Sequence, residues 1–505
     1  MMKSFSVTLT HEINNELINH LIRDDYQEDL CFALYLPSKG NTRFTGILQE
    51  VILPKDGERK VHGNVSFNSN YLERVLSLAR ERNMGIVFLH SHPAPGWQGM
   101  SIPDIEAENR ISKSAYAATG FPLLGMTLGT DGAWSGRFWI KDKNVKRTYS
   151  KHWCKSVKVL DNGMSFTFNE SLCDEHMDLD SQIRTISAWG KQNQIKLSRI
   201  KVGIVGLGSV GSQVAESLAR TGFANVTFID FDNVEKKNLD RLTNVFSSSI
   251  GKAKVDAVEE GFIRSASSTN LSIYKSYYSI CEETGYRDAL DCDILISCVD
   301  RPWARQVLNY IAYCHLIPVI DGGIKVRTNS DNSKMIAADW KVQTVGYNKP
   351  CLECLGQYKT SHAMLEQEGF LDDPEYINGM SEKTDLDNSE NVFPFSANVA
   401  SLQVLQLISS IVKPSGRAYP GQQVHHMVIG NTETNRTLSC DELCFFKSNK
   451  GKSDFTGVIP YAEHLFAKQE RDKRLTKRNG DKVKNTELNI ITKLCHFIKE
   501  TFNSK

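Results

Sequence analysis

A glycine-rich turn between a predicted strand and a predicted helix constrains the fold of this chain more than any other feature. Residues 202–205 are apolar and strand-like, and they are followed by Gly206-Leu-Gly-Ser-Val-Gly211 and then by apolar residues at helical spacing. Gly206 allows a tight turn, Gly208 lets the backbone approach a phosphate, and Gly211 permits close packing of the helix. The helix N-terminus then faces the anion. The pattern predicts a strand–turn–helix unit that binds ATP or a dinucleotide.

Strand-like and helix-length segments alternate around this turn. Apolar runs at 226–229, 294–297 and 318–320 are separated by helix-length segments, and a helical segment at 181–189 precedes the turn. Such alternation predicts a mostly parallel, doubly wound sheet of the Rossmann type. The first 150 or so residues combine short β-rich runs with one clear helix at 71–82. We therefore expect an α/β protein, with an N-terminal α+β domain followed by a doubly wound, Rossmann-like domain.

Composition narrows the classes of function. At roughly 150 residues per domain, 505 residues predict two to four domains. Sixty Lys and Arg against 59 Asp and Glu give a net charge of +1, so the overall charge offers no argument for a nucleic-acid partner. We find no apolar run approaching ~20 residues and no charged-then-apolar leader at Met1. These observations predict no membrane partner and a cytoplasmic location.

Changes in periodicity suggest the domain boundaries. The stretch from 146 to 180 is polar, loses its periodicity and is interpreted as a linker. The stretch from 447 onward is rich in Lys, Asn and Asp and has an apolar stripe only near its end. It is expected to be a loosely attached extension with a terminal helix. The predicted divisions are a domain at 1–145, the linker at 146–180, a domain at 181–446 and the extension at 447–505.

Two histidines follow a predicted buried strand at 85–89. His90 and His92 lie two apart in extended chain, so their side chains project to one side. Asp104 lies at the expected start of a helix, with Ser101 three residues before it. Two nitrogens and one oxygen, with one position left for water, form the ligand set of a catalytic zinc. Such a zinc lowers the pKa of its water and polarises a carbonyl, and Ser101 could donate a hydrogen bond to the oxyanion.

The same residues resemble the motif of the JAMM (MPN+) metallo-isopeptidases. That family combines a remote Glu with His-x-His-Pro and then Ser-x-x-Asp, and here the interval from His92 to Ser101 is one residue longer than in the common form. The resemblance implies that the general base is a Glu upstream, for which Glu28 ranks first and Glu50 second. If neither reaches the metal, the domain is an inactive scaffold.

The residues after the glycine-rich turn distinguish between nucleotide chemistries. The turn, with Asp230 at the end of the next strand to bind ribose hydroxyls, also fits an NAD-dependent dehydrogenase. The order of Asp230-Phe-Asp232, Asn238-Leu-Asp-Arg241 and Gly251-Lys-Ala-Lys254 resembles the ubiquitin-activating-enzyme superfamily, including the ThiF/MoeB-like adenylyltransferases. The resemblance implies an acidic pair of Asp230 and Asp232, phosphate contacts from Asn238, Arg241 and Lys254, magnesium at Asp300, and an arginine, Arg184, that reaches the triphosphate of a neighbouring subunit.

Two closely spaced cysteine pairs stand out among the twelve cysteines. Cys351-Leu-Glu-Cys354 and Cys440-Asp-Glu-Leu-Cys444 could supply four thiolates to a closed structural zinc site, or they could be independent thiols. The activating-enzyme family places a zinc similarly, although the second pair here is one residue wider than the commonest form. No cysteine occurs from 355 to 398, where activating enzymes often carry the thioester-forming residue. Adenylation is therefore favoured, and thioester formation stays open.

Together the resemblances imply a bifunctional enzyme that processes and activates a ubiquitin-like protein. Its cofactors would be a catalytic zinc, a structural zinc, and ATP with magnesium. Its partners would be a ubiquitin-like protein, a conjugating-enzyme-like or sulfur-donor protein, and a second copy in a homodimer. The pairing resembles prokaryotic fusions found with ubiquitin-like partners, which implies a role in conjugation or antiphage defence. The alternatives are a sulfur-carrier adenylyltransferase for cofactor biosynthesis, a non-catalytic scaffold that binds ubiquitin-like proteins, and a dehydrogenase.

Overall fold

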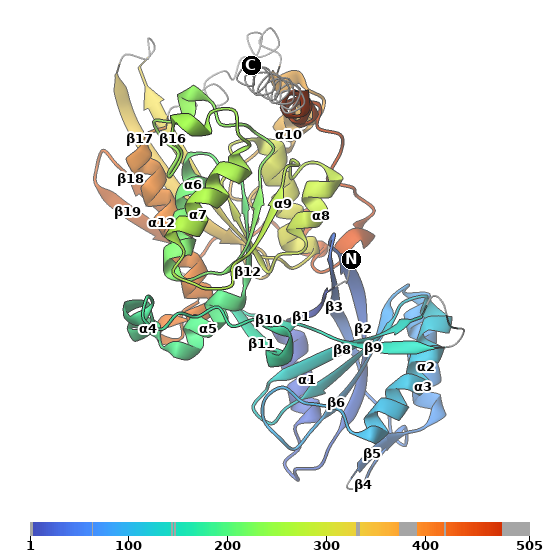
Figure 1. The fold of residues 1–505 in the computed structure, drawn as a ribbon. Helices are drawn as coiled ribbons and strands as arrows, with labels where there is room; N and C mark the ends of the chain where they lie inside the picture. Colours follow the sequence, from blue (N-terminus) through green and yellow to red (C-terminus); the bar gives the residue numbers. More distant parts are fainter. Residues whose placement is uncertain are drawn as a thin grey trace, which may run out of the picture.

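The computed structural model describes residues 4–62, 64–142, 145, 148–329, 334–372, 391–418 and 421–476. It contains two large sheets, each with its own helices (Figure 1). The apolar stripe expected near the C-terminus, with its terminal helix, lies outside the described residues.

The N-terminal unit is built on a nine-stranded mixed sheet in the order β11-β10-β1-β3-β2-β6-β7-β8-β9. The central strands β2 and β6 are almost entirely buried because they are nearly continuous apolar runs. The elements are β1 (Ser4–Thr10), α1 (His11–Leu21), β2 (Leu30–Lys39), β3 (Arg43–Ile52), the hairpin β4 (Arg59–His62) and β5 (Asn64–Phe67), α2 (Ser69–Glu81), β6 (Gly85–Ser91), α3 (Ile102–Thr119), β7 (Leu123–Leu128) and β8 (Trp134–Lys141).

Part of the stretch expected to be a linker instead belongs to this sheet. It contains β9 (Tyr149–Trp153), β10 (Ser156–Leu160) and β11 (Met164–Phe168). Strand β10 pairs in parallel with β1, with Ser6 opposite Ser156. These strands are short and partly polar, so their periodicity is weak. Strand β9 pairs with β8 and β11 pairs with β10, whereas β10 joins the sheet through residues about 150 positions earlier in the chain.

The second unit contains an eight-stranded sheet in the order β14-β13-β12-β15-β16-β17-β18-β19. The first five of these strands are parallel and the last three are antiparallel additions. The strands are β12 (Lys201–Val205), β13 (Asn225–Ile229), β14 (Ser272–Ser276), β15 (Ile294–Ser297), β16 (Val319–Thr328), β17 (Met335–Val345), β18 (Gln422–His426) and β19 (Asn431–Asn435).

Helices cover both faces of the parallel strands, as expected for a doubly wound sheet. One face packs against α5, α6, α7 and α12, and the other against α8 and α9. The helices are α4 (Ile183–Trp189), α5 (Lys191–Arg199), α6 (Ser209–Thr221), α7 (Lys254–Ser265), α8 (Glu283–Ala289), α9 (Pro302–Cys314), α10 (Thr360–Gln367), α12 (Phe393–Val412) and α13 (Phe445–Ser448).

Helix α12 departs from the expectation that the chain has no long apolar segment. Among the described residues, it is the one helix long and apolar enough to cross a membrane, with 20 residues and a mean hydropathy of 1.4. More than half of its apolar stretch, 56%, is buried within the protein. It packs on α6, β16 and β17, which is the position of a core helix.

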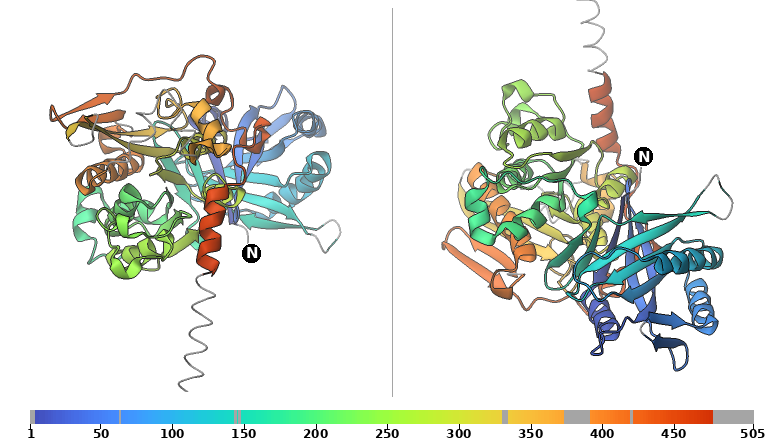
Figure 2. Two further views of the ribbon diagram at one scale, coloured as in Figure 1. Left: turned by 90° about the horizontal axis from the view of Figure 1, so that it is seen from above. Right: turned by 60° about the horizontal axis from the view of Figure 1, so that its bottom comes forward.

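Buried hydrogen bonds and an ion pair connect the two units. The Asp291 carboxylate accepts hydrogen bonds from the backbone N–H groups of Thr42 (2.9 Å) and Arg43 (2.8 Å). Arg43 pairs with Asp293 at 2.6 Å, and Lys158 donates to the Asp293 carbonyl oxygen at 3.2 Å. Asp293 directly precedes β15, so the N-terminal unit contacts the amino ends of the parallel strands. The carboxyl ends, where the glycine-rich turn lies, are at the opposite edge of the parallel strands. Figure 2 shows the two units from two further directions.

Candidate nucleotide site and metal centres

The glycine-rich turn lies between β12 and α6, where a nucleotide phosphate would meet backbone N–H groups. Gly206 has a φ of +85°, in the left-handed region. A Cβ on Gly211 would lie 1.9 Å from the Gly206 carbonyl oxygen, so only glycine allows this approach. A Cβ on Gly208 would meet nothing within 4 Å. Gly208 is the N-cap of α6, and the space beside its Cα is open.

Asp230 follows β13 at the same edge of the sheet. Its side chain accepts hydrogen bonds from the backbone N–H groups of Leu207 (2.6 Å) and Asp232 (2.7 Å). These bonds fix the carboxylate next to the glycine-rich turn. Each carboxylate oxygen retains capacity for a further hydrogen bond, so Asp230 can accept from ribose hydroxyls.

Asp232, Lys254 and Asp300 bring charges of both signs to this edge. The Lys254 ammonium lies 2.7 Å from the Asp232 carboxylate. Burial, followed by the charge of Asp230, raises the pKa of Asp232 to about 6. Burial opposes the charge on Lys254, but Asp230 and Asp232 outweigh it and raise the pKa of Lys254. Asp300 follows the carboxyl end of β15, at the same edge of the sheet, and its charge acts on both Asp232 and Lys254. Carboxylates placed in this way could hold a magnesium ion beside the phosphates.

The Asn238–Arg241 loop docks on the first turn of α6. Ser209 Oγ donates to the Arg241 carbonyl oxygen at 3.3 Å. The Arg241 guanidinium donates to the Lys237 carbonyl oxygen at 2.5 Å, and Asn238 Oδ1 accepts from the Glu235 backbone N–H at 2.9 Å. Asn238 therefore shapes the loop, and the partly exposed Arg241 stands beside the glycine-rich turn.

Arg184 is placed apart from these residues. Its side chain is exposed on α4, which lies beside α5 near the end of the unit that faces the N-terminal sheet (Figure 1). The role implied for it, in the site of a neighbouring subunit, stays a prediction.

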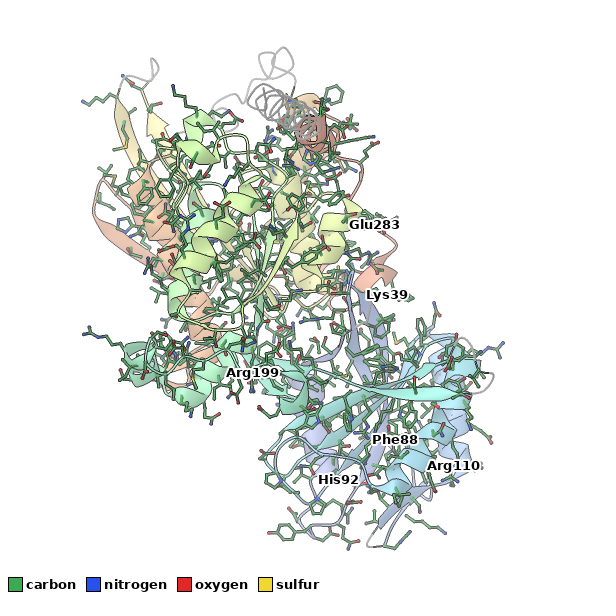
Figure 3. The ribbon with its side chains drawn as sticks, in the orientation of Figure 1. Lys39, Phe88, His92, Arg110, Arg199 and Glu283 are labelled. Atoms are coloured by element: carbon green, nitrogen blue, oxygen red, sulfur yellow. The ribbon has the colours of Figure 1, made fainter. Side chains whose placement is uncertain are left out.

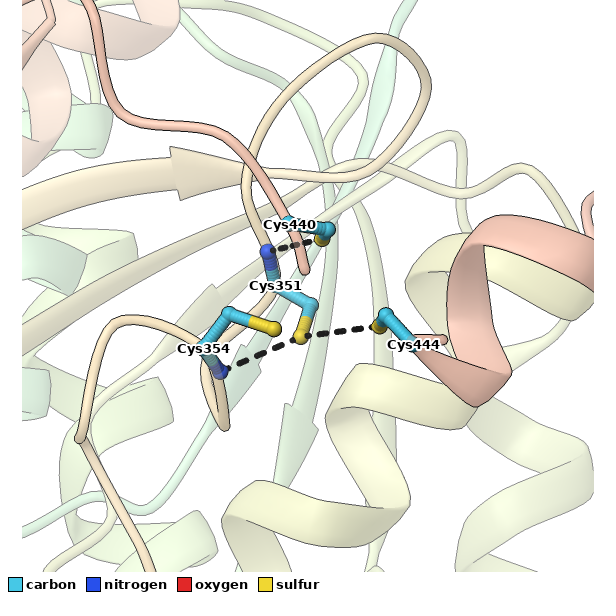
Figure 4. Close-up of side chains that lie close together, drawn as sticks. All are labelled: Cys351, Cys354, Cys440 and Cys444. Atoms are coloured by element: carbon cyan, nitrogen blue, oxygen red, sulfur yellow. Dashed lines mark hydrogen bonds between the residues drawn. The ribbon is translucent and has the colours of Figure 1, made fainter. Parts of the chain in front are cut away.

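The four predicted cysteines form one cluster, although their pairs come from distant loops (Figure 4). The Sγ atoms of Cys351 and Cys444 lie 3.7 Å apart, close to the ~3.8 Å between ligands in a tetrahedron with Zn–S bonds of ~2.3 Å. Cys440 accepts a hydrogen bond from the Cys351 backbone N–H, and Cys351 accepts one from that of Cys354. This donor set fits a structural zinc with four thiolate ligands and no open position.

The N-terminal histidines also gather as expected. The Nε2 atoms of His90 and His92 lie 3.1 Å apart, and Asp104 oxygens lie 3.6 and 3.4 Å from them. Donors ~2.0–2.1 Å from one tetrahedral ion are separated by ~3.3 Å, so the three residues fit a zinc. Ser101 is the N-cap of α3 and forms a capping box with Asp104, which orients the carboxylate. Figure 3 shows His92 at the end of its unit away from the second sheet.

The pairing of the strands places the two candidates for the general base, Glu28 and Glu50, at different distances from the histidines. Glu28 precedes β2, whose Leu30 lies opposite His90. The hydrogen bond to Asp104 raises the pKa of His92, and the charge of Glu28 adds to this shift. Glu50 pairs with Leu34, roughly 13 Å along β2 from that point, and forms an ion pair with Arg82. The structure therefore places Glu28 near the histidines and Glu50 away from them.

A buried network beneath His90 was not expected from the sequence. Arg137 donates to Thr127 Oγ1 at 2.6 Å, and Thr127 Oγ1 lies 3.4 Å from His90 Nε2. Arg137 also pairs with Glu108, and both side chains are fully buried. The sequence signal for this network is Glu108, which lies on the inward face of α3. A buried ionisable residue is unusual unless it is paired.

Comparisons with known proteins identify the second unit. The model of the ThiF family matches residues 179–444. Three curated relatives match shorter stretches. Adenylyltransferase and sulfurtransferase uba4 of Neosartorya fischeri is 30% identical over 171 residues, which cover 33% of this chain and 31% of the relative. Molybdopterin-synthase adenylyltransferase of Escherichia coli is 25% identical over 175 residues (34% and 64%). Ubiquitin-like modifier-activating enzyme 5 of Xenopus laevis is 29% identical over 128 residues (23% and 32%).

The matches thus span slightly less than a third of the length of two of these relatives and 64% of the length of the third. Among solved structures, E. coli MccB with ATP is similar at a TM-score of 0.40 and 18% identity, over 53% of this chain and 74% of that chain. The family match covers more than half of the 505 residues and includes the glycine-rich turn, the acidic pair and both cysteine pairs. The chain belongs to the ThiF family.

Proposed function

We propose that the second unit uses ATP to adenylate the C-terminal carboxylate of a ubiquitin-like or sulfur-carrier protein. The observation that carries the proposal is the convergence of the glycine-rich turn, Asp230, Asp232 and Lys254 at the carboxyl edge of the parallel strands. The relatives are named for adenylyl transfer or for activation of a ubiquitin-like modifier. These names support the sulfur-carrier alternative better than the bifunctional hypothesis.

The chemistry requires charge stabilisation more than proton transfer. An oxygen of the partner's carboxylate attacks the α-phosphorus, the bond from that phosphorus to the bridging oxygen breaks, and pyrophosphate leaves. The N–H groups at the start of α6 face the phosphates, and Lys254 and Arg241 neutralise the charge that develops on them. Asp232 and Asp300 would hold magnesium, which would supply further positive charge next to the phosphates. Asp230 orients the nucleotide through its ribose.

The test is ATP–pyrophosphate exchange by the purified protein with small proteins that end in glycine. Exchange is expected only with a cognate partner, and Arg241→Ala should lower its rate by at least ~100-fold because a phosphate-neutralising charge is lost. Lys236→Ala, a change of a neighbouring basic residue, is the control and should retain exchange. A thiocarboxylate on the partner after addition of a sulfur donor would select sulfur transfer, and an isopeptide would select conjugation. Absence of exchange with every partner, despite ATP binding, would contradict adenylation.

We also propose a second activity, zinc-dependent hydrolysis of a peptide or isopeptide bond by the N-terminal unit. The spacing of His90, His92 and Asp104 supports this proposal. A zinc held there would polarise the scissile carbonyl and lower the pKa of a bound water. Glu28 would take the proton of that water and pass it to the leaving amine, while Ser101 keeps Asp104 in position.

Metal content separates this site from the cysteine cluster. The wild-type chain is expected to hold two zinc ions, and His92→Ala should hold one because a nitrogen ligand is lost. Glu28→Gln should keep both ions and lose hydrolysis of a ubiquitin-like fusion by at least ~100-fold. Glu50→Gln is the matched control and should keep both ions and activity. Equal zinc content in wild type and His92→Ala would contradict the metal site, and full activity in Glu28→Gln would contradict its role as base.

A further inference from the structure

The chain beyond the cysteine cluster returns to the nucleotide edge of the second sheet. A helix over 465–476 brings Arg474 to the loop that directly follows Asp230. The Arg474 guanidinium donates to the carbonyl oxygens of Phe231 (2.5 Å) and Asp232 (3.3 Å) and to Asn233 Oδ1 (3.1 Å). One side chain of the polar extension thus binds three consecutive residues, Phe231, Asp232 and Asn233, which we call the ribose loop.

Other residues of the same segment hold the side chains of this loop. The Phe231 ring makes edge contacts with His464 and Phe466, with ring centroids 5.2 and 5.9 Å away. Asn233 donates to Glu470 at 3.0 Å. The loop is therefore packed against the C-terminal segment through its backbone and its side chains.

The helix has an anchor of its own on the second unit. Arg471 makes two hydrogen bonds of 2.6 Å to Glu282, and its guanidinium lies 4.4 Å from the centre of the Tyr278 ring. Bidentate pairs of this kind fix orientation as well as distance. Arg474 therefore approaches the loop from a helix that is tied to the unit elsewhere.

One peptide group connects Arg474 to the ribose-binding carboxylate. The carbonyl of Phe231 and the N–H of Asp232 belong to the same planar peptide. Arg474 binds that carbonyl, and that N–H donates to Asp230 Oδ1 at 2.7 Å. A charged donor on the carbonyl both orients the peptide and strengthens its N–H as a donor.

We infer that Arg474 is a positioning residue for the nucleotide ribose, because it fixes the peptide that orients the Asp230 carboxylate. The inference rests on the proposed function, since it assigns Asp230 to the ribose of ATP. Loss of Arg474 leaves the glycine-rich turn, Lys254 and Arg241 in place. Its largest effect is therefore expected on recognition of the ribose hydroxyls.

The test compares the binding of ATP and 2′,3′-dideoxy-ATP by calorimetry with the full chain. Wild type should prefer ATP by ~10-fold or more, and Arg474→Ala should lose most of this preference, as expected when hydrogen bonds to a charged group are lost. Arg474→Lys keeps one charged donor and should be intermediate. Lys468→Ala changes an exposed residue of the same helix that pairs with Glu463, and should match wild type.

The outcomes separate this inference from the proposed function. An Arg474→Ala protein that folds and keeps the wild-type preference for ATP overturns the role of Arg474. If that variant does not fold, a wild-type preference in Arg474→Lys overturns it equally. A wild-type protein that binds both nucleotides equally overturns ribose recognition by Asp230 but leaves adenylation standing. A wild-type protein that binds neither nucleotide overturns both.

Discussion

Replacement of Cys351 by alanine is expected to release one zinc ion and to lower the free energy of unfolding by more than about 4 kcal/mol. Cys351 is completely buried, and its sulfur is close to the other three cysteines. The cluster joins the loop after β17 to the segment before α13, and both pack on the core around α9. Without the metal, the three remaining thiols stay close together with no ion between them, and the two loops lose their main connection. Zinc analysis and thermal unfolding of the same preparation measure both effects.

A buried thiol outside the cluster provides the control for this prediction. Cys314 is buried at the end of α9, and Cys314→Ala removes a sulfur of similar burial without touching the four-cysteine group. Cys314→Ala should lower the free energy of unfolding by about 1 kcal/mol and leave the zinc content unchanged. If Cys351→Ala has the same zinc content as wild type and unfolds no more easily than Cys314→Ala, the structural zinc site is wrong.

The sequence predicts that the residues of the nucleotide edge lie together because their spacing along the chain is short. Gly206 and Gly211 are needed by a turn of six residues, and Asp230 lies at the end of the next strand, so spacing alone brings them together. Asp104 follows the same logic, since its helix starts shortly after β6 and its capping residue Ser101 is visible in the sequence. Sites of this kind depend on short chain segments and on rules that apply to single turns.

Features that depend on pairing between distant segments cannot be predicted from such local rules. The ranking of Glu28 over Glu50 depends on the register of β2 against β6 and β3, which places one carboxylate nearer the histidines than the other. Strand β10 is inserted beside β1 by pairing that no local pattern encodes. Arg474 occurs in a lysine-rich stretch that resembles a solvated tail, yet its guanidinium binds backbone carbonyls of the ribose loop. In each case a residue distant in sequence supplies the deciding contact.

The second large effect is expected at Gly208, where alanine should lower the affinity for ATP by at least ~100-fold while the protein stays folded. A Cβ at this position meets no atom within 4 Å, and the backbone φ of −76° is not in the left-handed region that requires glycine. The free energy of unfolding should therefore change by less than about 1 kcal/mol. In the bound state the methyl group would occupy the space at the start of α6 where the phosphates meet backbone N–H groups. Calorimetric titration with ATP and thermal unfolding measure the two quantities separately.

Gly211→Ala provides the contrast, because its methyl group would clash with the protein itself. The added Cβ would lie 1.9 Å from the Gly206 carbonyl oxygen, a backbone atom that can move only if the turn opens. This variant should lose about 3 kcal/mol of stability, and it should lose ATP binding as a consequence. If Gly208→Ala binds ATP as tightly as wild type, the phosphates do not lie at this helix terminus. A stability loss in Gly208→Ala as large as that in Gly211→Ala would instead mean that the open space beside Gly208 is needed for folding, not for the nucleotide.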